Sequence, residues 1–241
     1  MCFTIEIHLT RKAIEDRFRV DTSALYDFDF NYFYRAFSNP FIPVIAQEDS
    51  SRAQLMQWGL IPAWSRDLEE AERIRKGTYN ARSETLHEKP SFKDALSRGR
   101  CLIIAGGFFE WQLVNQMKIP WYISLKNGAP FVFAGLCDSW RDSLSGDIRR
   151  TCSIITTEAN PLMEKIHNTK KRMPVILNTD LEEEWISGET SLLKRKKMLQ
   201  AYNESDLKAY TVTPRLSSSM AEPSDPHMIE PYEQLFPGKL F

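Results

Sequence analysis

The chain has no long apolar run and no excess of charge of either sign. No stretch of the 241 residues reaches the ~18 consecutive apolar side chains that a membrane-spanning helix needs. The N-terminal segment also lacks the basic region followed by an apolar one that marks a secretory signal. Lys and Arg number 31 against 32 Asp and Glu, so nucleic-acid binding would require a local basic patch. These absences predict a cytoplasmic protein without a membrane partner.

The cysteines are few and widely spaced. The four of them form no C-x-x-C pair, and three lie in apolar runs; they are Cys2, Cys101, Cys137 and Cys152. A disulfide framework or a zinc site is typically marked by paired cysteines. We therefore predict reduced thiols, with no metal and no cofactor.

The composition predicts one domain with a large core. Hydrophobic residues make up 42% and aromatic residues 12% of the chain, which suits a single domain over residues 1–241. Apolar runs of strand length dominate the second half, and helical segments do not alternate regularly with them. The pattern favours an α+β fold with a mostly antiparallel, barrel-like β core and peripheral helices. The Pro- and Ser-rich residues 214–241 are expected to form a tail that wraps the surface.

Periodicity and capping residues predict the individual elements. Helices are expected at residues 11–18, 67–77 and 191–202. Strands are expected at residues 2–9, 37–49, 52–59, 100–111, 118–128, 129–140, 149–160 and 207–212. Residues 175–186 read as a strand followed by a capped helix. The dipeptide Asn127-Gly128 predicts a two-residue hairpin between the strands that flank it.

Cys2 carries the most distinctive chemistry in the chain. An initiator Met is normally excised when the next side chain is small, so the mature chain is expected to begin at Cys2 with an α-amine beside a thiol. These groups titrate near ~8 and ~8.5 in model peptides, so part of each population is nucleophilic at neutral pH. An aldehyde would form an imine with the amine, and the thiol would then close a five-membered thiazolidine. The plain alternative is that Cys2 merely begins a strand.

Polar side chains gather at residues 80–84, directly after a predicted helix stop. Arg82 could bind a phosphate with two parallel hydrogen bonds, and Asn80 could hydrogen-bond a ribose or the amine of Cys2. The same residues would also suit an ordinary capping turn. The sequence leaves both interpretations open.

Two further titratable residues stand out. Glu110 lies in an otherwise apolar strand, so its carboxyl group either faces water or is desolvated, with the raised pKa that general acid catalysis needs. His167 is expected at a helix end, where it could shuttle protons or simply cap the helix. The basic residues that follow it could hold an anionic backbone; they are Lys170, Lys171 and Arg172.

Tryptophan side chains are further candidates for binding DNA bases. Stacking on an exposed base contributes ~1 to 3 kcal/mol per contact and needs an accessible ring face. Four tryptophans could stack exposed bases, although each of them taken singly fits the core better; they are Trp58, Trp64, Trp111 and Trp121.

Five ordered motifs together resemble the SRAP family, the SOS response-associated peptidase proteins, which process abasic sites in single-stranded DNA. The motifs are Met1-Cys2, Trp58-Gly59-x-x-Pro62, Asn80-Ala81-Arg82-x-Glu84-Thr85, Cys101-Leu102 ahead of Gly107-Phe108-Phe109-Glu110-Trp111, and Ile166-His167 leading to Arg172-Met173-Pro174. The resemblance implies an enzyme with lyase-like chemistry. Cys2 would form a reversible thiazolidine crosslink with the ring-opened sugar of an abasic site, and removal of Met1 could be an autopeptidase activity.

The resemblance also implies roles for single residues. Asn80 would position the Cys2 amine and the sugar. Glu110 would handle protons at the nascent ring and during its reversal, and His167 would act on the sugar oxygen or the imine. Arg82 and Arg172 would hold phosphates.

The chain departs from the family pattern in two places. Phe3-Thr4 replaces the usual Gly-Arg after the cysteine, so one phosphate contact is missing and Phe3 is free to stack or pack instead. The link between His167 and Arg172 is longer than usual, and its two lysines could compensate for the missing arginine.

Two other classes of function remain open on the sequence. One is an N-terminal-nucleophile amidohydrolase in which Cys2 attacks an amide with its own amine as base. The other is a noncatalytic module that binds single strands through its tryptophans. For the favoured class we expect a monomer whose partner is single-stranded DNA containing abasic sites, and which is nucleoid-associated when bound to DNA.

Overall fold

The computed structural model describes residues 2–233. The strands are β1 (Thr4–Glu6), β2 (Tyr34–Arg35), β3 (Phe41–Ala46), β4 (Asp49–Trp58), β5 (Asn80–Arg82), β6 (Arg100–Ala105), β7 (Gly107–Val114), β8 (Met117–Leu125), β9 (Phe131–Arg141), β10 (Ile148–Glu158), β11 (Arg172–Pro174) and β12 (Leu207–Thr211). The α-helices are α1 (Arg11–Phe18), α2 (Leu68–Arg75), α3 (Pro90–Arg98), α4 (Pro161–Ile166), α5 (Thr179–Ile186) and α6 (Leu192–Met198). Within this range, no helix is long and apolar enough to cross a membrane.

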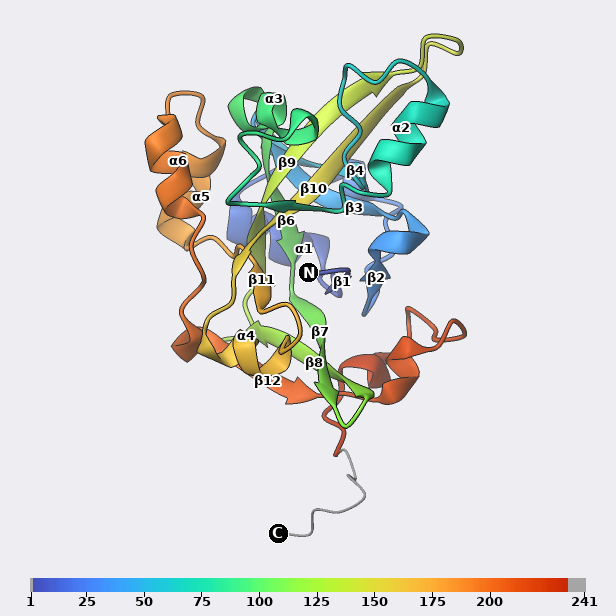
Figure 1. Ribbon diagram of the computed structural model, residues 1–241, viewed down its shortest axis with the longest axis vertical. Coiled ribbons are helices and arrows are strands. Elements are labelled where there is room, and N and C mark those ends of the chain that lie inside the picture. Colours follow the sequence, from blue (N-terminus) through green and yellow to red (C-terminus); the bar gives the residue numbers. More distant parts are fainter. Residues whose placement is uncertain (1, 234–241) are drawn as a thin grey trace.

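A closed barrel forms the centre of the molecule (Figure 1). Its strands pair in the order β10-β4-β3-β6-β9, and β9 pairs again with β10, which closes the ring. The β10–β4 pairing is parallel, and the other pairings in the ring are antiparallel. Closure leaves no free edge within the ring. The predicted α+β fold with a mostly antiparallel, barrel-like core and peripheral helices is confirmed.

The barrel strand β6 is buried on both faces. Cys101 and Ile103 belong to one core cluster, whereas Leu102 and Ile104 belong to a second. Helices α3 and α5 pack on this strand and cover its outer face. An uninterrupted apolar run is therefore what this strand requires, since successive side chains point to opposite faces of a sheet.

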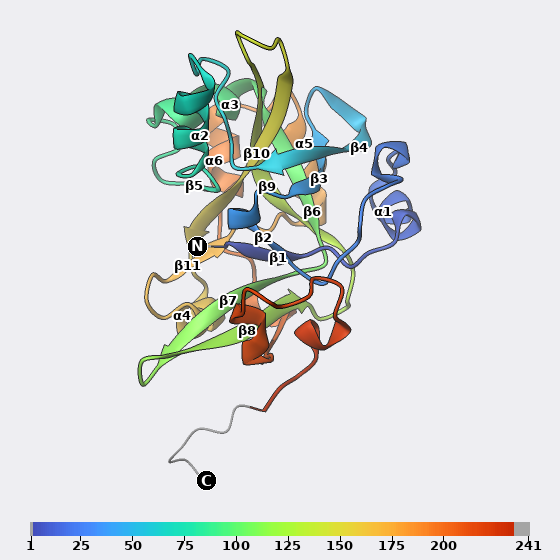
Figure 2. The same ribbon diagram turned by 90° about the vertical axis from the view of Figure 1, so that its right-hand side faces the viewer.

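A second sheet, in the order β12-β8-β7-β1-β2, lies against one end of the barrel (Figure 2). The β7–β8 hairpin turns at Asn115 and Gln116, whose φ angles are +49° and +66°. Two successive positive φ angles match the twist of flanking strands in a tight hairpin. Strand β1 pairs with β7 on one side and with β2 on the other, so the segment after Cys2 is held between two strands.

The predicted tail contributes to the core over its described part. Two short 3-10 turns, Pro214–Ser217 and Pro226–Ile229, follow β12. Leu216 and Met228 are fully buried in a cluster with Phe109 and Tyr122 of the second sheet. Residues 234–241 of the predicted tail lie outside the described residues.

The hairpin predicted at Asn127-Gly128 is wrong. A turn does occur there, and Gly128 has φ +68°, but β8 pairs with β7 and β12 whereas β9 pairs with β6 and β10. The connection therefore carries the chain from one sheet to the other. A turn dipeptide fixes the local bend, and the longer-range pairing of the flanking strands decides whether that bend joins neighbours.

Candidate active site

Cys2 is fully buried and lies two residues before Thr4, the first residue of β1. Its thiol donates a long hydrogen bond of 3.7 Å to the carbonyl oxygen of Thr4, and its own carbonyl oxygen accepts a hydrogen bond of 2.9 Å from Nδ2 of Asn80. Burial raises the pKa of the thiol, and the nearby carboxyl group of Glu110 raises it further. Glu110 therefore acts on the Cys2 thiol electrostatically, while Asn80 holds the backbone of the same residue.

Asn80 reaches Cys2 from β5, which runs parallel to β10 with Ile154 opposite Asn80. Alternation along the strand puts Asn80 and Arg82 on one face and the buried Ala81 on the other. Since Nδ2 donates to the Cys2 carbonyl, Oδ1 is left to accept. Among the described residues this buried Oδ1 has no hydrogen-bond partner, so it can accept a hydrogen bond from an incoming amine or hydroxyl.

Glu110 lies on β7 with 3% of its surface exposed. Burial raises the pKa of its carboxyl group to about 7. The alternative in which this carboxylate faces water does not hold, because the side chain is buried. At neutral pH both protonation states are populated, which is the condition for a group that both donates and accepts protons.

His167 follows α4 and is 7% exposed. Its Nδ1 lies 2.8 Å from the carbonyl oxygen of Arg172. Because a carbonyl only accepts, Nδ1 carries the proton and Nε2 presents a lone pair. Nε2 lies 3.9 Å from Oε2 of Glu110, and burial lowers the pKa of the imidazole. The ring is therefore held neutral, with its basic nitrogen turned toward the carboxyl group.

A cavity of about 500 Å³ opens at this point. Glu110 and His167 line it together with aromatic side chains of three segments, Phe3, Phe37 and Trp111. Cationic side chains also line it: Arg35, Lys118 and Lys170. The cavity thus combines an acid–base pair, apolar ring surface and positive charge, which suits a ligand with a polar reactive end and an anionic backbone.

The candidate cations fall into two groups. Arg82 and Lys170 are exposed, and Lys171 is exposed with its Nζ 3.8 Å from a carboxyl oxygen of Glu164. Arg172 differs, because its guanidinium makes two hydrogen bonds to the carboxyl group of Glu84, of 2.8 and 3.0 Å.

Arg172 also donates 2.7 Å to the carbonyl oxygen of Thr156, and the residue is 9% exposed. Both terminal nitrogens of this buried guanidinium already donate hydrogen bonds within the protein, so the pair is not available to bind a phosphate. The expected phosphate contact of Arg172 is therefore corrected to an internal ion pair.

The candidate tryptophans also separate. Trp58 is fully buried, and its Nε1 donates 2.9 Å to the carbonyl oxygen of Tyr79, so it presents no face for base stacking. Trp64 is 45% exposed, with Nε1 3.3 Å from the carbonyl oxygen of Pro90. The predicted base-stacking role of Trp58 is therefore wrong, because residue type alone does not tell a buried tryptophan from an exposed one.

Several cavity residues were missed by sequence reasoning. Arg35 comes from residues 21–36, which are rich in Asp, Tyr and Phe without a clear period. Phe37 begins the segment predicted as a strand at residues 37–49, and Lys118 comes from a hairpin. Leu216 and Ser217 reach the cavity from the tail, where Oγ of Ser217 accepts 3.0 Å from Nε1 of Trp111. Nothing in their local sequence marks them, since only the pairing of distant segments brings them together. Among the described residues, no group of three or more His, Cys, Asp and Glu is arranged to hold a metal ion.

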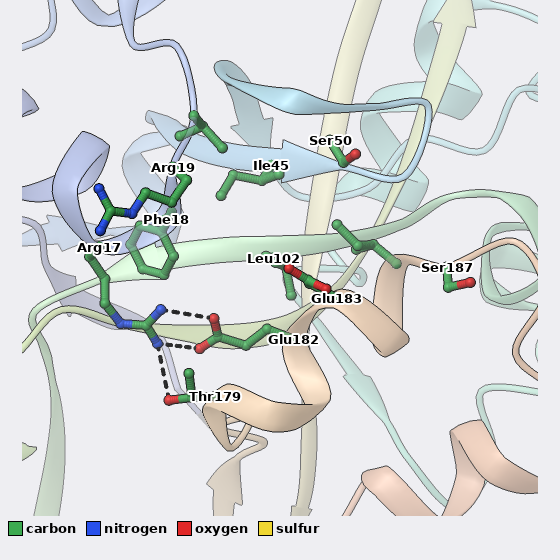
Figure 3. Close-up of a pocket in the computed structure, with 12 residues that line it drawn as sticks. Arg17, Phe18, Arg19, Ile45, Ser50, Leu102, Thr179, Glu182, Glu183 and Ser187 are labelled. Carbon is green, nitrogen blue, oxygen red and sulfur yellow. Dashed lines mark hydrogen bonds and ion pairs between the residues drawn. The ribbon is translucent and has the colours of Figure 1, made fainter.

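A second cavity, of about 480 Å³, lies between α1 and α5. Figure 3 shows Arg17 reaching across it to Glu182, with two hydrogen bonds of 3.0 and 2.5 Å. Arg17 also donates 3.4 Å to Oγ1 of Thr179. None of the predicted site residues lines this cavity.

Comparison with known proteins gives a consistent result. The family model for the SOS response associated peptidase (SRAP) matches residues 1–219. The chain is similar to the abasic site processing protein YoqW of Bacillus subtilis, at 40% identity over 195 residues, 80% of this chain and 83% of that protein. It is similar to the abasic site processing protein YoaM of Bacillus subtilis, at 37% identity over 223 residues, 90% of this chain and 93% of that protein. A crystal structure of a protein from Bacteroides thetaiotaomicron superimposes with a TM-score of 0.91 at 34% identity, covering 96% of this chain and 100% of that one.

Proposed function

Because this chain belongs to the SOS response-associated peptidase family, we propose that it recognises abasic sites in single-stranded DNA and crosslinks them through Cys2. The two Bacillus relatives are named for abasic site processing, which supports the class of substrate. The crosslink requires removal of Met1, so that Cys2 carries a free α-amine. The ring-opened abasic sugar supplies an aldehyde, the electrophile that an amine and a thiol on one residue capture together.

The chemistry balances without a cofactor. The amine adds to the aldehyde carbon and loses one water, which leaves an imine. The thiol then adds to the imine carbon, forming the C–S bond while its proton passes to nitrogen. The product is a thiazolidine, and addition of water with breakage of the C–S and C–N bonds reverses the sequence. An imine alone would promote β-elimination and strand breakage, so ring closure protects the strand.

The residues around Cys2 suit these steps. The buried Oδ1 of Asn80 can accept from the amine or from a sugar hydroxyl while Nδ2 holds the Cys2 carbonyl. The carboxyl group of Glu110, with its pKa raised to about 7, can protonate the ring heteroatom during reversal. The neutral imidazole of His167 can take a proton at Nε2 from the sugar hydroxyl as the aldehyde forms.

One observation carries the proposal. Asn80 holds the backbone carbonyl of Cys2, the buried Cys2 thiol has Glu110 as its electrostatic neighbour, and Glu110 and His167 line one cavity. A nucleophile, an acid and a base thus come from three separate segments of the chain, and Glu110 is the neighbour of both Cys2 and His167. Exposed Arg82, Lys170 and Lys171 supply positive charge for the strand, and exposed Trp64 supplies a ring face.

The test is incubation with single-stranded DNA that contains one abasic site, followed by denaturing electrophoresis and intact-protein mass measurement. A covalent adduct at the mass of the chain without Met1 is expected. Hydrolysis of an added amide substrate to its acid and its amine, with no adduct on the DNA, would favour an amidohydrolase. Binding without either product would favour a noncatalytic module, and a protein that retains Met1 in its native host would contradict the mechanism.

A further inference from the structure

A phenylalanine of the cavity is unusually exposed. Phe37 lies in the 3-10 turn Ala36–Ser38 and leaves 66% of its surface accessible. The residue lines the same cavity as Glu110 and His167. Removing a phenylalanine ring from water normally stabilises a fold by about 1.5–3 kcal/mol, so an exposed ring at a site marks a surface that a ligand can cover.

The ring is held in place before any ligand arrives. Phe37 stacks on Phe3 with ring centroids 4.9 Å apart and an interplanar angle of 29°. Tyr79 meets Phe37 edge-on at 5.4 Å and Phe3 edge-on at 6.4 Å. The backbone N–H of Ala36 donates 2.9 Å to the carbonyl oxygen of Phe3, and the Tyr79 hydroxyl bonds Oδ1 of Asn39 at 2.9 Å. These contacts define a rigid aromatic platform, Phe3–Phe37.

The surroundings of the platform favour a nucleobase. Cations line the same cavity at Arg35, Lys118 and Lys170, as a phosphate backbone would require. An abasic site lacks its own base, so the base next to it has lost a stacking partner on one side. The exposed ring of Phe37 in the cavity can therefore stack on the exposed face of the base next to the abasic site.

We infer that Phe37, backed by Phe3, stacks on the base that adjoins the abasic sugar and takes the place of the missing base. The inference rests on the proposed function and adds to it a subsite for the flanking nucleotide. Every base has a ring face, so the contact tolerates all four bases and favours purines, which offer more area. An intact strand keeps its bases stacked on one another and gains less from the platform.

The experiment uses single-stranded DNA with a tetrahydrofuran abasic analogue, which has no aldehyde and cannot crosslink. A fluorescent 2-aminopurine is placed on one side of the analogue or the other, and its quenching and the Kd are measured. Phe37→Ala is expected to weaken binding about tenfold and to abolish the quenching. Phe37→Trp should retain both, because it keeps a larger ring in the same position.

Phe41→Ala is the matched control. Phe41 is 54% exposed on β3 and lies outside the set of residues that line the cavity. This variant should bind and quench as the wild type does. Wild-type binding and quenching by Phe37→Ala, or an equal loss in Phe41→Ala, overturns the inference.

Crosslinking of aldehyde-bearing abasic DNA is scored separately. An adduct from the wild type, with unchanged quenching in Phe37→Ala, overturns the platform and leaves the proposed function standing. Platform-dependent quenching without any adduct supports the platform and contradicts the thiazolidine chemistry. Absence of quenching by the wild type on both sides of the analogue overturns the platform whatever the crosslinking result.

Discussion

Two cavities of similar volume, about 500 Å³ and about 480 Å³, each contain a buried carboxyl group. In the cavity of Figure 3, Arg17 grips Glu182 with two hydrogen bonds, and positive and negative charge are matched within the protein. In the other cavity, Glu110 faces the imidazole of His167 across 3.9 Å, and burial favours the neutral form of both groups.

The difference shows what separates a carboxyl group in a structural ion pair from one that can transfer protons. Burial raises the pKa of Glu182 as well, although Arg17 opposes the shift, so a raised pKa does not distinguish the two sites. Geometry does, because an arginine cannot give up its proton whereas a histidine can. The cavity with the histidine can pass protons to a ligand, and the cavity with the arginine is suited to holding α1 against α5.

The largest effect is expected at Cys2. Cys2→Ser keeps the α-amine and removes the ring-closing sulfur, so the stable adduct should be lost completely while an imine remains that borohydride can trap. Denaturing electrophoresis with and without reduction measures both species. Cys137→Ser, a change at a buried thiol outside the candidate site, should crosslink as the wild type does. Equally stable adducts from Cys2→Ser would exclude the thiazolidine.

The second prediction contrasts the two carboxyl groups directly. Glu110→Gln preserves the shape of the side chain and removes the exchangeable proton, so release of preformed adduct should slow by ~10²-fold. Release is followed after annealing a complementary strand or adding an aldehyde trap. Glu182→Gln should release at the wild-type rate. If Glu110→Gln also does so, the acid is a different group.

The pH dependence of release gives a third prediction. Because burial raises the pKa of Glu110 to about 7, the carboxylic acid is depleted as the pH rises through that value. Release from the wild type should therefore fall by roughly tenfold per pH unit above the pKa and level off below it. Glu110→Gln should show no such inflection between about pH 6 and about pH 9. An identical profile in both proteins would assign the inflection elsewhere.

Local signals in the sequence predicted much of the fold. The α1 segment matches the predicted helix at residues 11–18, and Asp67 caps α2 through the N–H of Glu70, as its position suggested. Helix α3 was not predicted, although Pro90 at its start and Phe92, Ala95 and Leu96 on one face are ordinary helix signals. The sheet to which each strand belongs could not be predicted at the Asn127-Gly128 turn, which connects the two sheets, because strand pairing depends on distant partners.

The candidate site was predictable where one residue carries the chemistry. Cys2, Asn80, Glu110 and His167 stand out by type and position, and the structure brings them together. Burial was not predictable from type, which is why Trp58 and Arg172 were assigned to DNA although both are buried. Phe37 had no local signal, since its importance comes from stacking on Phe3.

The fourth prediction concerns stability and the same pair of carboxyl groups. Arg17→Ala leaves Glu182 buried without its cation and should lower the free energy of unfolding by about 2 kcal/mol, between the values for exposed and buried pairs.

Glu110 makes the stability depend on pH, because its folded-state pKa is raised from 4.5 to about 7 and the folded chain binds the extra proton. As the pH rises through that window, the wild type should lose stability relative to Glu110→Gln. Urea unfolding of the three proteins measures both effects, and equal stabilities throughout would contradict the assignment of either group.

The smallest effect is expected from an exposed cation, and it separates Arg82 from Arg172. Arg82 is exposed on β5 beside Asn80, so Arg82→Ala should weaken binding of single-stranded DNA modestly and reduce the slope of log K against log salt by about one unit. Arg172→Ala removes the partner of Glu84 and should instead lower the unfolding free energy, with the salt slope unchanged. Titrations at several salt concentrations, paired with urea unfolding, give both quantities for each variant. A lower slope in Arg172→Ala would mean that its ion pair with Glu84 opens to bind phosphate, and an unchanged slope in Arg82→Ala would place the backbone contact on Lys118, Lys170 or Lys171.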